Sequence, residues 1–323
     1  MSGRTAHIAL LSPGAKVGLT RAFVDSAASM GARLSAWESD PWSPAARLCE
    51  GSGPGGPIET DSAVGTLLVW SLRNGVNLVV PTRHDDLPML ARHRDQFERA
   101  GVAVAISATA CIELCLDKRA LGGWLNRHGF PTPEHTSAAE FEQSPLAGRF
   151  PLIAKPARGS GSRLVRTLDR AAEVAALSAD WIIQAPASGI EITVNTYVNR
   201  TGRCVCEIPH ERLLVSEGEV VRGRTIKEPA VMNLARQISE TLDGARGPLN
   251  IQLFWDRENH RAAVTDINPR FGGGYPLAHQ AGGRFATWLL DEYINNGSAA
   301  RFDRWEDRLL MARYREASFF HES

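Results

Sequence analysis

The first hundred residues alternate apolar runs with helical patterns, and this alternation restricts the fold more than any other feature of the sequence. Residues 19–30 and 87–100 carry apolar side chains at helical spacing. Four runs are typical of buried strands, at residues 7–12, 33–37, 78–81 and 102–106. Strands that alternate with helices predict a doubly wound, Rossmann-like α/β domain with a parallel sheet. The Gly- and Pro-rich residues 50–57 are predicted to form a surface loop.

The pattern changes after a boundary predicted near residues 107–110. A helix is expected over residues 111–129, which are followed by the sequence Pro131-Thr132-Pro133. Five predicted strands come next, at residues 152–155, 181–184, 192–198, 204–208 and 251–255. Three further helices are predicted at residues 170–177, 231–242 and 285–295. This larger part of the chain is therefore expected to be α+β, with more antiparallel sheet than the first part.

The composition of the 323 residues argues against several classes of protein. Lys plus Arg and Asp plus Glu number 36 each, so the chain lacks an overall electrostatic footprint for nucleic acid. No apolar run reaches the roughly 18 residues of a membrane helix, and the opening segment does not resemble a signal peptide. Five cysteines without paired CxxC motifs do not suit a zinc ribbon or a disulfide scaffold. We therefore expect a cytoplasmic, multi-domain protein that binds neither nucleic acid nor membrane.

Three oxygen-bearing side chains in the last third of the chain are expected to share one face of a sheet. Gln252 lies in a predicted strand, and Asp266 follows 14 residues later, a spacing that suits neighbouring antiparallel strands. Asn268 comes two residues after Asp266, so both side chains would point to one side of an extended chain. These oxygens suit Mg²⁺ when phosphates and water fill its other positions. A polar strand edge without a metal is the alternative interpretation.

The sequence around these residues resembles a known family. Residues 247–252 read Gly-Pro-Leu-Asn-Ile-Gln, residues 266–270 read Asp-Ile-Asn-Pro-Arg, and residues 271–276 read Phe-Gly-Gly-Gly-Tyr-Pro. Together they resemble the metal-binding end of the ATP-grasp fold. They are most similar to the large subunit of carbamoyl-phosphate synthase and its stand-alone relatives, and the resemblance runs from about residue 7 to about residue 294.

The resemblance implies two α+β lobes that clamp ATP, preceded by a Rossmann-like pre-ATP-grasp domain. The expected divisions are a pre-ATP-grasp domain at residues 1–107, an N-terminal lobe at 108–183, a C-terminal lobe at 184–310 and a tail at 311–323. The implied ligands are ATP and Mg²⁺, which Mn²⁺ could replace, and the implied partners are a small-molecule carboxylate and an amine. Because dimers are common in the family, a homodimer is compatible with the resemblance.

The nucleotide site of the family can be carried over residue by residue. Lys155 lies in an apolar strand, where an ammonium group is costly without a neighbouring anion. Gln184 stands where relatives commonly have Glu, which leaves selectivity for adenine open. A solvated lysine and a flexible linker are the alternatives for Lys118 and the glycine-rich loop. The resemblance implies phosphate contacts from Lys118, Lys155, Gly159, Ser160, Gly161 and Ser162, adenine contacts from Gln184, Ala185 and Pro186, and ribose contacts from Glu191.

The catalytic and metal-binding roles follow from the same resemblance. Arg270 and Lys155 are the expected catalytic residues, because cationic groups stabilise a transferred phosphoryl group. Gln252, Asp266 and Asn268 are the expected metal ligands. Asp266 stands where Glu is usual, so the number of metal ions, one or two, stays open.

Substrate contacts are predicted in three places. Arg212, Arg222 and Arg224 lie in a predicted loop over residues 210–225, and each guanidinium could hold a carboxylate bidentately. Gly273 could let a substrate approach the backbone closely, and Ser12 and Gly14 could contact it from the turn after the first strand. A solvated loop and simple turns are the alternatives.

The predicted function is the ATP-dependent ligation of a carboxylate, activated as an acyl phosphate, to an amine, with release of ADP and phosphate. A carbamoyl-phosphate-synthase-like enzyme that uses carboxyphosphate or carbamate would share the same nucleotide residues. A non-catalytic ATP-binding sensor is disfavoured, because the metal and phosphate positions all carry competent side chains. An NAD-dependent oxidoreductase has little support, because the sequence contains no GxGxxG motif.

Overall fold

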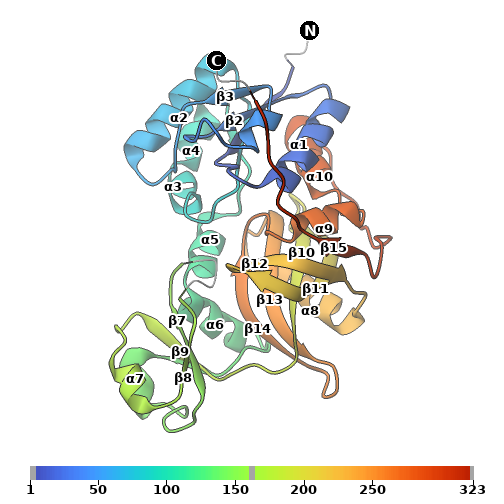
Figure 1. The fold of residues 1–323 in the computed structure, drawn as a ribbon. Coiled ribbons are helices and arrows are strands. Elements are labelled where there is room, and N and C mark those ends of the chain that lie inside the picture. The colour runs from blue at the N-terminus through green and yellow to red at the C-terminus, as the bar shows by residue number, and fades with distance from the viewer. Residues whose placement is uncertain (1–4, 160–163, 321–323) are drawn as a thin grey trace.

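The computed structural model describes residues 5–159 and 164–320, which form three sheets (Figure 1). The N-terminal sheet has five parallel strands in the order β3-β2-β1-β4-β5. Its strands are β1 (His7–Leu11), β2 (Arg33–Trp37), β3 (Gly51–Gly53), β4 (Leu78–Pro81) and β5 (Ala103–Val104). Its helices are α1 (Val17–Ser29), the 3₁₀ helix η1 (Ala46–Leu48), α2 (Asp61–Asn74), α3 (Leu87–Arg92) and α4 (Arg94–Arg99). The predicted doubly wound domain is confirmed.

Two of the predicted elements of this domain differ from the prediction, and helix α2 was not predicted. The predicted helix over residues 87–100 is divided into α3 and α4 at His93. Residues 50–57, predicted as a loop, contain the edge strand β3. Packing explains the glycines there. A Cβ added to Gly55 would lie 1.7 Å from Trp37 Cε2, and one added to Gly53 would lie 2.5 Å from Trp70 Cε2. A glycine-rich stretch is thus required by two tryptophan rings.

The second sheet is small and antiparallel, with the order β6-β9-β7-β8. Asp117 divides the predicted helix over residues 111–129, because its carboxylate accepts the backbone N–H groups of Arg119 and Ala120 and so begins a second helix. The elements of this part are α5 (Thr109–Leu116), α6 (Lys118–Arg127), β6 (His135–Ser137), the 3₁₀ helix η2 (Ala138–Gln143), β7 (Leu152–Pro156), β8 (Arg166–Leu168), α7 (Ala171–Ala175) and β9 (Trp181–Gln184).

The third sheet has six antiparallel strands in the order β14-β13-β10-β11-β12-β15. The predicted loop over residues 210–225 is wrong, since these residues form most of the β11–β12 hairpin. The elements are β10 (Ile190–Val198), β11 (Cys204–Ser216), β12 (Glu219–Thr225), α8 (Pro229–Thr241), β13 (Gly247–Asp256), β14 (Arg261–Asn268), α9 (Tyr275–Gln280), α10 (Phe285–Ile294) and β15 (Leu310–Ala312). Strand β15 spans the predicted boundary at residue 310.

The two faces of this sheet differ in polarity. Side chains that alternate along the central strands are fully buried and pack with α8 in one apolar core, among them Val194, Ile251 and Ile267. The residues between them carry amides, hydroxyls and carboxylates. One face therefore builds the core, and the other is free to build a site.

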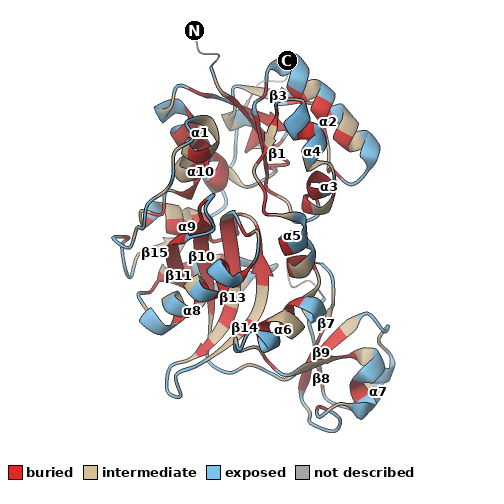
Figure 2. Ribbon diagram, turned by 180° about the vertical axis from the view of Figure 1, so that it is seen from behind, coloured by how far each residue is buried: buried red, intermediate tan, exposed pale blue. Residues whose placement is uncertain are grey.

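The N-terminal domain and the six-stranded sheet share a second apolar core. Phe23 of α1 lies edge-on to Phe271, with ring centroids 5.3 Å apart, and Leu10 of β1 belongs to the same buried cluster as Tyr197 of β10. Figure 2 shows buried residues continuing from the N-terminal sheet into this region. The N-terminal domain is therefore fixed against the C-terminal lobe. Within the described residues, no helix is long and apolar enough to cross a membrane.

Candidate active site

The strand register brings the three predicted metal ligands together. Gln252 lies opposite Asp266 on the neighbouring strand, and Asn250 lies opposite Asn268. Directly opposed residues of antiparallel strands project from the same face, so these four side chains line the polar face of the sheet. On the other side of β13, Thr193 lies opposite Gln252. The predicted metal ligands are therefore neighbours in space as well as in pattern.

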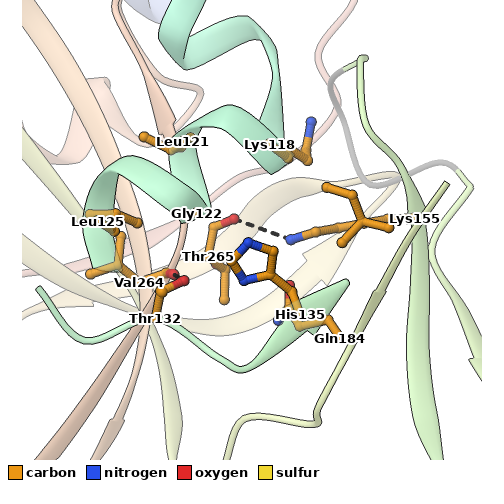
Figure 3. Close-up of a pocket in the computed structure, with 11 residues that line it drawn as sticks. Lys118, Leu121, Gly122, Leu125, Thr132, His135, Lys155, Gln184, Val264 and Thr265 are labelled. Carbon is orange, nitrogen blue, oxygen red and sulfur yellow. Dashed lines mark hydrogen bonds between the residues drawn. The ribbon is translucent and has the colours of Figure 1, made fainter. Parts of the chain in front are cut away.

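A β-bulge at Thr265 connects this face to Lys155. The register shifts between Gln252 and Leu253, so Thr265 is an extra residue without an opposite partner. Its carbonyl oxygen accepts a hydrogen bond of 3.1 Å from Lys155 Nζ, which reaches it from β7 of the other lobe (Figure 3). Burial lowers the pKa of Lys155 to about 8, while Asp266 opposes that shift and Lys118 adds to it. The ammonium group thus lies in a site that would favour an added anion.

Lys118 supplies a second ammonium group at the same place. It is the first residue of α6, its Nζ donates to the carbonyl oxygen of Gly159, and it lies 4.0 Å from Asp266 Oδ2. Its side chain is 12% exposed, and that of Asp266 is 15% exposed. Two lysines therefore share one partly buried carboxylate. This excess of positive charge is complementary to a polyphosphate.

A pocket extends from these lysines between α6 and the small sheet (Figure 3). Its apolar wall comes from Leu121, Leu125, Ile182 and Val264, and its polar lining from Lys118, Lys155, Thr132, His135, Gln184 and Thr265, with Gly122 completing it. Gly122 leaves room for the His135 ring, because an added Cβ would lie 2.3 Å from it. A pocket with one apolar wall and two ammonium groups has the chemistry that a base joined to phosphates needs.

The structure describes the predicted adenine segment in full and only part of the predicted phosphate segment. Gln184 lines the pocket and is buried. Ala185 donates its N–H to Glu134 O at 2.9 Å and Pro186 has none, so these two residues could offer a base only carbonyl oxygens. Gly159 adopts φ +114°, a conformation that favours glycine. The predicted phosphate residues Ser160, Gly161 and Ser162 lie outside the described residues.

The three predicted substrate arginines are separated by the register. Arg212 lies on the polar face, where its Nη1 is 3.3 Å from Glu191 Oε1, the predicted ribose ligand. Arg224 lies opposite Glu211 and forms an ion pair with it, so it projects from the other face. Arg222 is two residues away on that same side and is exposed. The prediction that Arg222 and Arg224 reach the substrate is therefore corrected, because a hairpin replaces the expected loop.

Arg270 follows the metal-ligand strand and is held by its neighbours. Its Nη1 donates to Phe271 O at 2.8 Å and its Nη2 to Asn268 Oδ1 at 3.4 Å, whereas its buried Nε has no partner among the described residues. Burial lowers the pKa of Arg270, and Asp266, Glu219 and Asp85 oppose that shift. The guanidinium remains charged, with part of its hydrogen-bonding capacity still available.

The glycines after Arg270 are required mainly by packing. An added Cβ at Gly272 would lie 1.9 Å from Asn250 Nδ2, and one at Gly274 would lie 2.4 Å from the His210 ring. Gly273 has more room, with Glu219 at 3.5 Å, and its carbonyl oxygen accepts from Arg313. Of the three glycines, Gly273, the predicted substrate contact, is thus the least constrained by packing.

The oxygen donors fit a divalent cation that arrives with phosphates. Within the described residues there is no group of three His, Cys, Asp or Glu side chains able to hold a metal. Asp266 is the only carboxylate of the predicted set, whereas Gln252 and Asn268 supply neutral amide oxygens. Mg²⁺ and Mn²⁺ prefer such oxygen ligands, and Mg²⁺ is usually shared with substrate phosphates. These three residues would therefore hold Mg²⁺ only together with a nucleotide.

Lys16 and His84 were missed by reasoning from sequence, although one signal pointed to Lys16. The chain contains 36 Lys plus Arg, of which only four are lysines: Lys16, Lys118, Lys155 and Lys227. Three of the four lie around this site, since Lys16 is close enough to Arg270 for the two charges to interact. At Gly14, a predicted substrate contact, the backbone N–H donates to Glu38 and the carbonyl oxygen accepts from Ser43.

Comparison with known proteins agrees with this architecture. The sequence matches the ATP-grasp domain over residues 115–274 and the PylC-like N-terminal domain over residues 8–105. The chain therefore contains an ATP-grasp domain preceded by a PylC-like N-terminal domain. A search of curated protein sequences finds no match.

Solved structures share the fold at low sequence identity. The biotin carboxylase domain of Hydrogenobacter thermophilus 2-oxoglutarate carboxylase, solved with MgADP and bicarbonate, is 14% identical, with a TM-score of 0.74 over 95% of this chain and 73% of that one. L-amino acid ligase from Bacillus licheniformis is 15% identical, with a TM-score of 0.70 over 93% and 76%. Rhizobium etli pyruvate carboxylase is 17% identical, with a TM-score of 0.72 over 92% of this chain, which spans only 29% of that one.

Proposed function

We propose that the protein is an ADP-forming ligase that activates a carboxylate as an acyl phosphate and joins it to an amine. One observation carries this proposal. Two lysines of the smaller lobe reach the larger lobe, Lys118 at Asp266 and Lys155 at the Thr265 carbonyl oxygen, next to a pocket with one apolar wall. ATP would lie between the lobe of residues 108–183 and that of residues 184–310, with its phosphates at Lys118 and Lys155.

Each proposed role follows from a side chain's position. Gln252, Asp266 and Asn268 would hold Mg²⁺, which neutralises phosphate charge when bound. Glu191 would accept hydrogen bonds from the ribose hydroxyls through its two carboxylate oxygens. Its ion pair with Arg212 would either break or persist beside the ribose. Arg270 would contact the transferred phosphoryl group and the substrate carboxylate. Because these groups position reactants and compensate charge, no protein nucleophile is needed.

The balance of the reaction defines its test. A carboxylate oxygen attacks the terminal phosphorus, ADP leaves, and the amine nitrogen then displaces phosphate, which keeps the attacking oxygen. One ¹⁸O atom from a labelled carboxylate must therefore appear in the released phosphate. We expect ADP formation that depends on both an acid and an amine, measured over panels of each, with label transfer detected by mass spectrometry.

The controls separate this reaction from the alternatives. Labelled bicarbonate that passes its oxygen to phosphate without an organic acid would indicate chemistry through carboxyphosphate, as the bicarbonate in the 2-oxoglutarate carboxylase domain suggests. Tight binding of MgATP without ADP formation under any condition would contradict the ligase and favour a nucleotide sensor.

A further inference from the structure

We propose that the crevice at the carboxyl ends of β1 and β4 binds the carboxylate substrate between Lys16 and Arg270, with Ser12 and His84 supplying uncharged hydrogen bonds. This inference rests on the proposed ligase function and adds the substrate side of the same site. It also names the ligand class, a compact carboxylic acid, from the charges that surround the crevice.

The topology of the N-terminal sheet predicts the position of this crevice. From β1 the chain proceeds outward to β2 and β3 on one side, whereas β4 and β5 extend the sheet on the other side. Adjacent strands whose connections leave in opposite directions open a crevice at their carboxyl ends, where ligands of such sheets bind. Ser12 and Lys16 follow β1, and His84 follows β4. The side chains in question therefore lie where this fold places a ligand.

Lys16 is held in place by neutral groups. Its Nζ donates to Thr82 Oγ1 at 2.9 Å and to Ser12 O at 3.4 Å, so two oxygen atoms without formal charge orient it. Burial, and after it the nearby charge of Arg270, lowers the pKa of Lys16 to about 8. The side chain is still largely protonated at neutral pH, and an ammonium group oriented by neutral partners can still bind an anion.

His84 and Ser12 carry polar atoms that the protein leaves unused. His84 is 6% exposed, and neither of its ring nitrogens has a hydrogen-bond partner among the described residues. Ser12 Oγ is likewise buried without a partner, and its backbone adopts φ +47°, which is uncommon for a residue with a Cβ. Burial lowers the pKa of His84 to about 4, so its ring is neutral and offers one donor and one acceptor. Buried groups of this kind call for a ligand or ordered water.

The charges around the crevice favour an anion over a cation. The acidic neighbours already have basic partners, since Asp86 and Asp85 lie 3.2 Å and 3.4 Å from Arg83, and Glu219 lies 2.6 Å from Arg313. Asp266 lies beside Lys118. Among the described residues, neither Lys16 nor Arg270 forms an ion pair, although the more distant Glu219, itself paired with Arg313, acts on both charges. A substrate carboxylate between them would compensate both charges and would face the phosphates from the side of Arg270.

The small number of lysines makes a direct test practical. The intact protein is treated with an amine-acylating reagent, and the modification rate of each of the four lysines is measured by mass spectrometry. Sodium acetate serves as the carboxylate probe, with sodium chloride at the same ionic strength as its reference. We expect acetate to slow modification of Lys16 and to leave the exposed Lys227 unchanged. An unchanged rate at Lys16 overturns the inference.

MgATP in the same experiment tests the proposed function separately. MgATP should slow the modification of Lys118 and Lys155. Unchanged rates at these two lysines would contradict the nucleotide site, and the effect of acetate on Lys16 could still be interpreted.

Variants supply the second measurement. Lys16→Met should raise the KM for the carboxylate by about 10- to 100-fold, the worth of one charged hydrogen bond, with an unchanged KM for ATP. His84→Leu should raise the same KM, and His84→Gln, which keeps a donor and an acceptor, should restore most of it. Lys227→Met is the matched control and should behave as wild type. A Lys16→Met variant that folds normally and keeps its carboxylate KM contradicts the inference.

Discussion

The two faces of the six-stranded sheet are built from neighbouring residues of the same strands, yet they have opposite tasks. Ile267 is fully buried in the core with α8, while Asp266 beside it faces Lys118 and lies close to the lysine of β7. The backbone hydrogen bonds of a strand do not distinguish the two faces, so the side chains alone determine which face forms the core and which forms the site. Substitutions on the polar face should therefore remove chemistry with little effect on stability, and substitutions on the apolar face should do the reverse.

The largest expected effect is on Asp266 and Lys155. Asp266→Ala removes the only carboxylate among the proposed metal ligands, and Lys155→Ala removes a buried ammonium group from the phosphate site. Each should reduce ADP formation by about 10³-fold or more, measured as turnover with MgATP and a competent substrate pair. The circular dichroism spectrum should change little. Glu258→Ala, an exposed carboxylate in the β13–β14 turn, is the control and should keep full turnover.

A second comparison uses two arginines on opposite faces. Arg270→Ala should lower kcat by about 10²–10³-fold, because the guanidinium is expected to act on charge that develops during transfer. The KM for ATP should change much less. Arg222→Ala is the matched control. Arg222 is exposed on the face opposite the polar one and should tolerate truncation. Equal losses in the two variants would contradict the assignment of faces, and an Arg270→Ala defect confined to ATP affinity would contradict its catalytic role.

The apolar face should respond in the opposite way. Ile267→Val deletes one buried methyl group next to Asp266 and should lower the free energy of unfolding by about 0.5–1.5 kcal/mol. Urea denaturation measures that change, and steady-state turnover at a temperature where both proteins are folded should be unchanged. A fall in kcat without a fall in stability would show that the two faces are not independent.

The polar face was largely predictable, because alternation in a strand depends only on residue spacing. The distance from Gln252 to Asp266 and the two-residue step to Asn268 were enough to place them together. The bulge was not predictable, since Thr265 has no feature that marks it as an extra residue. Without the bulge, Val264 would share a face with Asp266, whereas it lies opposite Leu253 in the core. The carbonyl group that orients Lys155 is a consequence of that irregularity.

The errors in the predicted site come from long-range structure. Arg222 and Arg224 belonged to a charge-rich stretch that is typical of loops, and only pairing with β11 and β15 makes it a strand. His84 follows a short strand in a polar turn, and nothing in its local sequence indicates burial. Its position depends on packing between domains that are distant in sequence. Patterns within one strand are thus readable from sequence, and contacts between domains are not.

The smallest expected effect is the contribution of Lys155 to the pH dependence of folding stability, measured without nucleotide. The pKa of Lys155 is about 8 in the folded chain and near its usual 10.5 when unfolded. Between these values the unfolded chain binds a proton that the folded chain has released, so this group makes folding more favourable as pH rises. Lys155→Met removes that contribution. Relative to the variant, the wild type should therefore gain stability, on the order of 1 kcal/mol, from about pH 8 to about pH 10.

Urea denaturation of both proteins at the two pH values measures this double difference, which cancels titrations common to both. MgATP should reduce the difference, because phosphate oxygens beside the ammonium group would return its pKa toward the usual value. Asp266 and Lys118 are the charged neighbours that act on this group, so Asp266→Asn should enlarge the difference by removing the opposing carboxylate. A double difference of zero would mean that Lys155 keeps its ordinary pKa in the folded protein, and the need for an anion at this face would then have to come from Lys118 alone.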